Sequence, residues 1–179
     1  MELIPCKKHE FDEIYTLMQQ SFIPDELRSR EAALAVMDDP AFTVYHLVEG
    51  GERVGFITAW ALDEFLFLEH FATYEKFRNR GLGKKALEAI LARHPLAVLE
   101  AEVPQTPLQK RRIAFYERCG FVCNDIPYFQ PTYSEKGAPV PLVLMSSGKA
   151  LADPHAAARA IYQKVYHKNY LLEESDEKA

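Results

Sequence analysis

The sequence predicts a mixed α/β fold with a mainly antiparallel central sheet of about seven strands, flanked by helices and followed by an extra C-terminal helix. Three observations support this prediction. The 179 residues suit one well-packed domain. Runs rich in β-branched and aromatic residues on either side of Gly50-Gly51 are typical of an antiparallel hairpin. Segments with apolar residues at helical spacing lie before and after that hairpin.

The individual elements have clear start and stop signals. Apolar residues at helical spacing from Phe11 onward predict the first helix, and Ser29 is a favourable N-cap for the second. Pro95 and Gly120 end two later helices. Residues 65–73 carry apolar side chains on both faces, as expected of a central strand. In chain order we expect a strand at 2–5, helices at 9–20 and 29–37, strands at 42–49, 53–62 and 65–73, a helix at 81–94, a strand at 96–103, a helix at 109–119, strands at 121–130 and 140–146, and a helix at 153–172.

We expect one domain over residues 1–147, and a helical extension with a charged tail over residues 148–179. The extension carries Tyr162, Tyr166 and Tyr170 at successive i, i+4 positions, which form an aromatic stripe on one helix face. Packing of this stripe on the parent domain is the favoured interpretation. A contact in a homodimer is the alternative.

Composition excludes several classes of protein. Apolar residues make up 48% and charged residues 26%, which suits a packed core rather than a disordered chain. The longest apolar run, residues 56–62 with Thr58 counted in, falls far short of the ~20 residues that cross a bilayer, so no membrane partner is expected. The first residues do not have the order of a secretory signal. Three cysteines without metal-ligand spacing predict free thiols, no metal and a cytoplasmic location.

Charge is unevenly distributed along the chain. Residues 1–69 carry 5 positive and 14 negative side chains, whereas residues 70–118 carry 10 positive and 5 negative ones. A basic middle segment attracts phosphates and other anions. A net charge of -5 without a dominant basic face argues against a nucleic-acid partner.

The most informative segment leads from an apolar strand through a short loop into a helix. The loop contains, in order, Arg78, Asn79, Arg80, Gly81, Leu82, Gly83 and Lys84. Unpaired N–H groups at a helix start carry the positive end of the helix dipole, and glycines let a ligand approach them closely. The loop therefore favours a phosphate group. The alternative is an ordinary glycine-containing connection with solvated basic residues.

The pattern Arg-x-x-Gly-x-Gly at Arg78, Gly81 and Gly83 resembles the acetyl-CoA pyrophosphate loop of the GCN5-related N-acetyltransferase (GNAT) superfamily. The segment 113–121 resembles the second signature of that family, around a helix tyrosine and a terminal Gly-Phe. The order of elements over residues 1–147 also follows the family. The resemblance implies a GNAT-type fold and acyltransferase activity.

The resemblance also implies a set of cofactor contacts, with acetyl-CoA as co-substrate. Main-chain groups near Phe71, Ala72 and Thr73 would hold the pantetheine, and a β-bulge is the device that exposes such groups. The loop 78–84 would hold the pyrophosphate, and Gln109 would contact the cofactor from the helix expected at 109–119. Asn79 stands where many members have glycine, which is acceptable because asparagine adopts left-handed conformations readily.

Two residues are the expected catalytic groups. Tyr116 would stabilise or protonate the departing thiolate as a general acid, the alternative being a core tyrosine packed beside Ile113. Glu69 interrupts an apolar strand and would act as the base or as an amine-binding carboxylate. The alternatives are a water chain as the base, and a glutamate whose charge is satisfied by a nearby arginine or a backbone donor. His70 is not expected to pair with Glu69, because adjacent strand residues face opposite sides.

The acceptor is less strongly specified. Glu100 and Glu102 lie on one face of a strand and, together with Glu26, would line a cavity for a cationic substrate. A solvated edge face is the alternative. Phe22 and Glu26 lie in the loop between the first two helices, where the family often shapes its acceptor pocket.

Together these observations predict an N-acetyltransferase that moves an acetyl group from acetyl-CoA directly to a primary amine of a small molecule or peptide. A non-catalytic CoA-binding regulatory module of the same fold is the alternative. A nucleotide-binding protein, whose basic loop holds another phosphate ligand, is a third interpretation.

Overall fold

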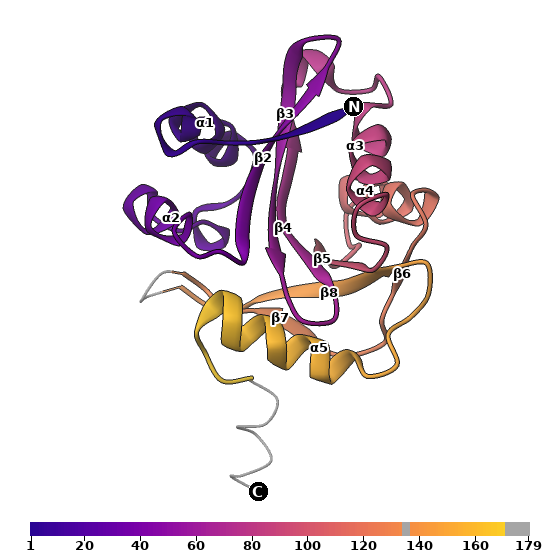
Figure 1. Cartoon of the computed structure of the whole chain (residues 1–179). Helices are drawn as coiled ribbons and strands as arrows, with labels where there is room; N and C mark the ends of the chain where they lie inside the picture. Colours follow the sequence, from indigo (N-terminus) through magenta and orange to yellow (C-terminus); the bar gives the residue numbers. More distant parts are fainter. Residues whose placement is uncertain (134–136, 171–179) are drawn as a thin grey trace, which may run out of the picture. The chain divides into compact units, whose positions relative to one another are not determined.

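The computed structural model describes residues 1–133 and 137–170 (Figure 1). The chain divides into two compact units, Met1–Ala97 and Val98–Ala179. The predicted mixed α/β class with mainly antiparallel pairing is confirmed. Within the described ranges, none of the helices has the length and apolar character that crossing a membrane requires.

The first unit is built on an antiparallel meander. Its strands pair in the order β1–β2–β3–β4, and the hairpin between β2 and β3 turns at Gly50-Gly51 as expected. The strands are β1 (Glu2–Pro5), β2 (Phe42–Glu49), β3 (Glu52–Ala61) and β4 (Leu66–Thr73). Three successive residues at the start of β4, Leu66 to Leu68, are buried, which agrees with a strand covered on both faces.

Helices cover the meander on two sides. The helical segments are η1 (Lys8–Glu10), α1 (Phe11–Ser21), η2 (Pro24–Glu26), α2 (Arg30–Val36), η3 (Glu75–Phe77) and α3 (Leu82–Leu91). Figure 1 shows α1 and α2 on one side of β2, β3 and β4, and α3 on the other. The apolar stripe of α1, including Phe11 and Ile14, packs with Val44 of β2 and Phe56 of β3. Ser29 caps α2 as expected, since its Oγ accepts from the Ala32 N–H at 3.2 Å.

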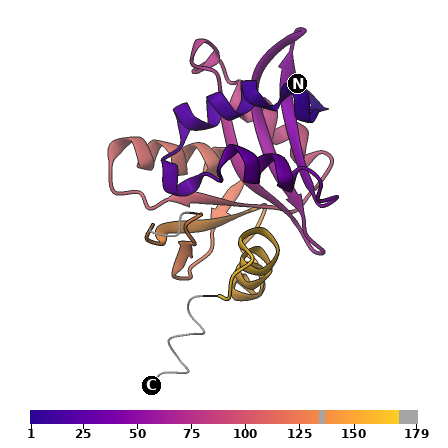
Figure 2. The same cartoon turned by 90° about the vertical axis from the view of Figure 1, so that its left-hand side faces the viewer.

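The second unit has its own antiparallel strands, and β8 pairs with β5, β6 and β7. Its elements are β5 (Ala97–Glu102), α4 (Pro107–Arg118), β6 (Phe121–Cys123), β7 (Tyr128–Gln130), β8 (Val140–Ser147), α5 (Pro154–Ile161) and the π-helical turn η4 (Tyr162–Tyr166). Figure 2 shows α5 beside the strands of this unit. Helix α4 begins two residues before the expected Gln109, because Thr106 is its N-cap and Pro107 its first residue.

The single strand expected at residues 121–130 is two strands in the structure. Residues 121–130 form β6 and β7 with a break between them, so the described residues contain eight strands rather than about seven. Asn124 explains the break: its Nδ2 donates to the Leu144 carbonyl at 3.2 Å and to Ser146 Oγ at 3.1 Å. Its Oδ1 accepts from the Leu151 N–H at 2.8 Å. These bonds anchor the chain outside the strand ladder, and Pro127 then offers no N–H to resume it.

The C-terminal helix ends earlier than expected. The helical run stops at Tyr166, where His167 adopts a left-handed φ of 53° and the Lys168 N–H bonds back to the Tyr162 carbonyl at 3.0 Å. Residues 171 and 172 of the expected helix, and the charged tail, lie outside the described residues. The tyrosine stripe is buried, with Tyr162, Tyr166 and Tyr170 exposed by only 0%, 7% and 4%. This agrees with packing inside the chain.

Strand β4 contains a β-bulge at Glu69. Thr58 of β3 lies opposite His70, but the next residue, Ala59, lies opposite Leu68. Glu69 is therefore the extra residue on β4. A bulge bends its strand and changes which face the neighbouring side chains occupy, so the strict alternation of an ideal strand does not apply here.

Beyond the bulge, β3 approaches β4 closely at Gly55, which pairs with Thr73. A Cβ atom at Gly55 would lie 2.2 Å from the Ala72 carbonyl oxygen and 2.8 Å from the Thr73 Cα. Both neighbours are backbone atoms, which cannot move aside as a flexible side chain could. Glycine at this position therefore determines the course of the Ala72–Thr73 backbone.

We expect Gly55→Ala to destabilise the protein by about 1–3 kcal/mol, the usual cost of overpacking in a well-packed interior. Urea unfolding followed by circular dichroism measures the change. Gly50→Asn is the matched control, because a Cβ there meets nothing within 4 Å and its φ of 59° suits asparagine. Equal stability of the Gly55→Ala variant and the wild type would contradict the close approach.

Candidate active site

The loop from Arg78 to Lys84 forms an open helix start. Asn79 and Gly81 both adopt left-handed backbone conformations, with φ of 62° and 73°. Gly81 is the N-cap of α3, and no side chain bonds to the first amides of this helix. In an α-helix those N–H groups have no partner within the helix, and they lie at the positive end of its dipole. The loop geometry therefore suits an anionic ligand.

The basic side chains of this segment differ in their interaction partners. Lys85 forms an ion pair with Glu49, which also accepts the N-terminal amine at 2.8 Å. These two donors lower the pKa of Glu49 to about 2. Lys84 lies 3.7 Å from Glu88 on the same helix. Within the described residues the exposed Arg78 guanidinium forms no ion pair, so its charge is available to a ligand.

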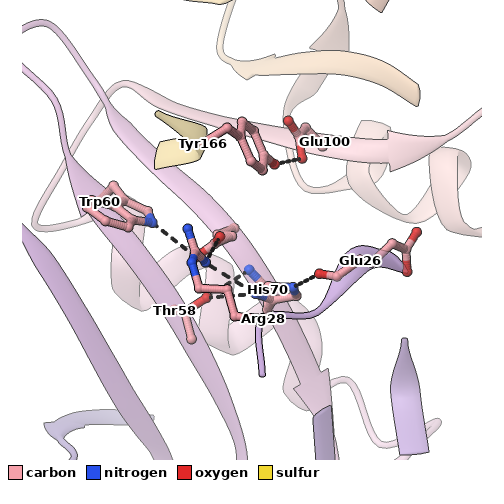
Figure 3. A network of polar contacts seen from close by, with 8 residues as sticks. Glu26, Arg28, Thr58, Trp60, His70, Glu100 and Tyr166 are labelled. Atoms are coloured by element: carbon pink, nitrogen blue, oxygen red, sulfur yellow. Dashed lines mark hydrogen bonds and ion pairs between the residues drawn. The ribbon is translucent and has the colours of Figure 1, made fainter. Parts of the chain in front are cut away.

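Glu69 lies in a buried polar network rather than in solvent. Figure 3 shows Arg28, Trp60 and His70 of this network. Arg28 Nη1 donates to Glu69 Oε1 in an ion pair, and Trp60 Nε1 donates to Glu69 Oε2 at 3.0 Å. The Glu69 side chain is only 2% exposed. The Arg28 guanidinium also lies over the Trp60 ring, 5.6 Å from its centroid. The expected alternative, a charge satisfied by a nearby arginine, describes this arrangement.

His70 belongs to the same network, and the expectation that it faces away from Glu69 is wrong. Its Nδ1 lies 3.9 Å from Glu69 Oε2, because the bulge at Glu69 breaks the alternation of faces. Its backbone N–H donates to Thr58 Oγ1 at 2.9 Å, and its Nε2 lies 2.9 Å from the Glu26 carbonyl. Since a carbonyl only accepts, Nε2 carries the proton. Burial lowers the pKa of His70, so the ring is neutral.

The contacts of His70 connect the loop after α1 to the centre of the sheet. The Phe22 ring meets the His70 ring edge-on, with centroids 4.8 Å apart. The Glu26 carboxylate accepts from the Ile23 N–H at 3.3 Å and so closes the turn of η2. Phe22, Glu26 and Glu69, which the sequence nominates separately, therefore lie around one histidine. Trp60 and His70 were not expected in this group. Their only signal in the sequence is a polar or amphipathic ring within an otherwise apolar strand.

Tyr116 lies on the buried face of α4 in the second unit. Its ring packs against Phe115 and Phe121, with centroids 5.3 Å and 6.0 Å away. Burial raises the pKa of Tyr116 to about 12, although the nearby Arg112 opposes the shift. In the part of the chain that the structure describes, the phenol oxygen has no hydrogen-bond partner. A neutral phenol with a free O–H is suited to donate a proton or a hydrogen bond.

The two glutamates of β5 have different partners. Glu100 accepts hydrogen bonds from the hydroxyls of Tyr128 and Tyr166, the latter at 2.8 Å (Figure 3). Burial, and then the Glu100 charge, raise the pKa of Tyr128 well above its ordinary value. Glu102 forms an ion pair with Arg112 of α4. Neither carboxylate is simply solvated.

Gln109 caps the helix that carries Tyr116. Its Oε1 accepts from the Thr106 N–H at 2.8 Å and from the Gln105 N–H at 3.1 Å, while its own N–H donates to Thr106 Oγ1 at 3.3 Å. This is a capping box, which the sequence Thr-Pro-Leu-Gln signals but the expectation of a cofactor contact overlooked. The side-chain oxygen of Gln109 is thus engaged in holding the helix start.

Comparison with known proteins identifies the family. The model of the acetyltransferase (GNAT) family matches residues 11–121. A solved structure described as an acetyltransferase from the GNAT family of Bacteroides thetaiotaomicron shares 32% identity at a TM-score of 0.89, covering 94% of this chain and all of that one. The comparison with curated proteins gives no match.

More distant structures share the fold. The ribosomal-protein-S18-alanine N-acetyltransferase from Escherichia coli has a TM-score of 0.60 at 17% identity, covering 85% of this chain and 96% of its own. An aminoglycoside 6'-N-acetyltransferase complexed with coenzyme A has a TM-score of 0.57 at 18% identity, covering 86% and 100%. The family match spans more than half of the chain and includes the loop, the bulge and the helix of Tyr116. The chain therefore belongs to the GNAT family of acetyltransferases and is an acyltransferase.

Proposed function

We propose that this acyltransferase takes its acetyl group from acetyl-CoA and transfers it directly to a primary amine of a small molecule or peptide. The open helix start at 78–84 is the observation that carries the proposal. Two left-handed residues, a cap without a side-chain bond and the Arg78 charge together suit the pyrophosphate of coenzyme A. The coenzyme A bound to the aminoglycoside acetyltransferase of the same fold supports this donor.

The remaining proposed cofactor contacts lie at the end of β4, before the loop, and on α4. Main-chain groups of Phe71, Ala72 and Thr73 would receive the pantetheine, on a segment whose course depends on Gly55. Gln109 would contribute from α4, through the part of its amide that the capping box does not use.

The three cysteines are free thiols, which is consistent with a reducing compartment such as the cytoplasm.

The chemistry requires one bond to form and one to break. The neutral amine nitrogen attacks the thioester carbonyl, the carbon–sulfur bond breaks, and the products are an amide and coenzyme A with a free thiol. Tyr116 would donate its hydroxyl hydrogen to the departing sulfur, and the proton released by the amine restores the balance. Because burial raises the pKa of Tyr116 to about 12, the phenol is protonated throughout the physiological pH range.

Glu69 is better suited to bind the amine through its carboxylate than to abstract a proton. Uptake of a proton would weaken the Arg28 ion pair and the Trp60 hydrogen bond, both formed in a buried site. We therefore propose that Glu69 attracts and orients the protonated amine, and that the amine loses its proton through water. In this role Glu69 depends on Arg28 and Trp60 for its position.

The acceptor class follows from the distribution of carboxylates. The first 69 residues carry the excess negative charge, and Glu69, Glu100 and Glu102 are held in place by defined partners. Tyrosine rings beside a carboxylate, as around Glu100, attract cations through both charge and ring quadrupole. We propose an acceptor amine with a further positive charge, such as a polyamine, an aminoglycoside or a basic peptide end. The alternative is selection by the loop around Phe22.

The first prediction concerns the donor site. Gly81→Asp should weaken acetyl-CoA binding at least tenfold, because it places a negative charge at the helix start and strains a residue with a φ of 73°. Isothermal titration calorimetry measures the affinity. Gly148→Asp is the matched control, since Gly148 has a φ of 77° and equally open surroundings but lies outside the loop. Equal affinities in the two variants would refute the assignment.

The second prediction concerns the general acid. Tyr116→Phe should lower kcat by about 10² at unchanged acetyl-CoA affinity, because only the departing thiolate needs the hydroxyl. Thiol release under conditions where chemistry limits the rate provides the measurement, with Tyr45→Phe as control. An unchanged kcat excludes Tyr116 as the acid. A wild-type protein that binds acetyl-CoA but releases no thiol with any amine would instead indicate a binding module.

The third prediction concerns the acceptor. Glu69→Gln, Glu100→Gln and Glu102→Gln should each lower kcat/KM for a polyamine about fivefold more than for a neutral-tailed amine of equal length, because each removes one negative charge that attracts a cationic acceptor. Added salt should reduce the wild type's preference for the polyamine. The exposed Glu31→Gln variant is the control. Unchanged selectivity in all three variants would transfer the role to the loop around Phe22.

A further inference from the structure

His46 is an unusual residue for the interior of this protein. It lies on β2, paired with Ile4 of β1 and Phe56 of β3, and it is 2% exposed. Neither of its ring nitrogens has a hydrogen-bond partner among the described residues. Buried polar atoms are almost always hydrogen-bonded, and each exception calls for an explanation. An unpartnered buried imidazole suggests that a ligand is missing.

Two further ligand-forming side chains lie beside it. Cys6 follows β1 and is held against β2 by a hydrogen bond from its N–H to the Val44 carbonyl at 2.8 Å. Glu10 ends η1. The Cys6 sulfur, a Glu10 carboxylate oxygen and a His46 ring nitrogen all lie within 4.8 Å of one another. Three different elements thus bring a thiol, a carboxylate and an imidazole together.

We propose that Cys6, Glu10 and His46 bind a divalent transition metal ion of the zinc class, with water as the fourth ligand. Sulfur, imidazole nitrogen and carboxylate oxygen are the ligands that Zn²⁺ prefers. With metal–ligand distances of about 2.0–2.3 Å, tetrahedral ligands lie roughly 3.3–3.8 Å apart. Small side-chain rotations would bring the three groups to that spacing. The cysteine thiol loses its proton to solvent as the sulfur binds the ion.

The charged groups around the three ligands allow Glu10 to exchange its present partners for the metal ion. Glu10 now pairs with Arg53 through one oxygen and accepts the Lys7 N–H at 3.2 Å through the other. Arg53 also bonds Glu13 at 2.8 Å, so it retains a carboxylate partner when Glu10 turns to the metal. Lys7 is exposed, and water can replace Glu10 at its N–H. A thiolate and a carboxylate then neutralise the two charges of the ion beside a neutral imidazole.

Such a site is structural rather than part of acetyl transfer. It joins the end of β1, the turn η1 and the strand β2, and none of its residues belongs to the proposed donor or acceptor sites. A metal that binds only the folded chain raises its stability by mass action. No spacing motif in the sequence indicates this site, because Cys6 and Glu10 are separated from His46 by the whole of α1 and α2.

The test uses the full-length protein after dialysis against a chelator. Calorimetric titration with Zn²⁺ should show one equivalent bound, and Zn²⁺ should raise the unfolding temperature. Co²⁺ in its place should show thiolate-to-cobalt charge-transfer absorption together with the visible bands of a tetrahedral ion. Cys6→Ser and His46→Gln should each weaken Zn²⁺ binding at least tenfold, and Cys6→Ser should abolish the charge-transfer absorption.

Cys123→Ser is the matched control, because it removes an exposed thiol elsewhere in the chain and should leave Zn²⁺ affinity and the cobalt spectrum unchanged. Circular dichroism establishes that each variant is folded. The proposal is overturned if the wild type binds no Zn²⁺, if Cys6→Ser binds it as tightly as the wild type, or if the charge-transfer absorption disappears with Cys123. Acetyl transfer is not the readout, so the result is independent of the proposed enzyme function.

Discussion

The burial of the Glu69 carboxylate is the constraint on which the first unit depends. A buried charge is costly unless it is paired and hydrogen-bonded, and here Arg28 and Trp60 provide both. Arg28 comes from the connection between α1 and α2, so the ion pair holds that connection against the sheet. The bulge that admits Glu69 also turns His70 toward the same network. One extra residue in β4 thus couples a loop, two strands and a histidine.

The second unit also contains a carboxylate that is held by hydrogen bonds from other elements. Glu100 of β5 accepts hydroxyl groups from Tyr128 of β7 and Tyr166 of the C-terminal helix. Tyr162 of that helix donates to the Phe129 carbonyl. The terminal helix is therefore attached by polar bonds from an otherwise apolar aromatic stripe, and not by burial alone. Its packing and the position of Glu100 depend on each other, so the helix contributes to the surroundings of a proposed acceptor residue.

Local signals in the sequence were sufficient for much of the fold. Gly50-Gly51 indicates the β2–β3 hairpin, Ser29 the start of α2, and Pro95 and Gly120 the regions where α3 and α4 end, because each residue acts on backbone groups within a few positions of itself. The errors lie where distant groups compete with the local pattern. Asn124 ends β6 by bonding to Leu144, Ser146 and Leu151, and no local pattern reports those partners. His167 ends the last helix in a left-handed conformation that histidine adopts without an obvious signal.

The sequence by itself determined the mixed α/β class, the family and the open helix start at 78–84, since Asn79 and Gly81 act through backbone geometry within a few residues. Only the tertiary structure decided which side chains meet. Arg28 pairs with Glu69 across 41 positions, and His70 turns toward Glu69 instead of away from it. Cys6, Glu10 and His46 converge without any spacing motif. The physical reason is that these contacts depend on strand register, and a single inserted residue, at Glu69, changes the face on which its neighbours lie.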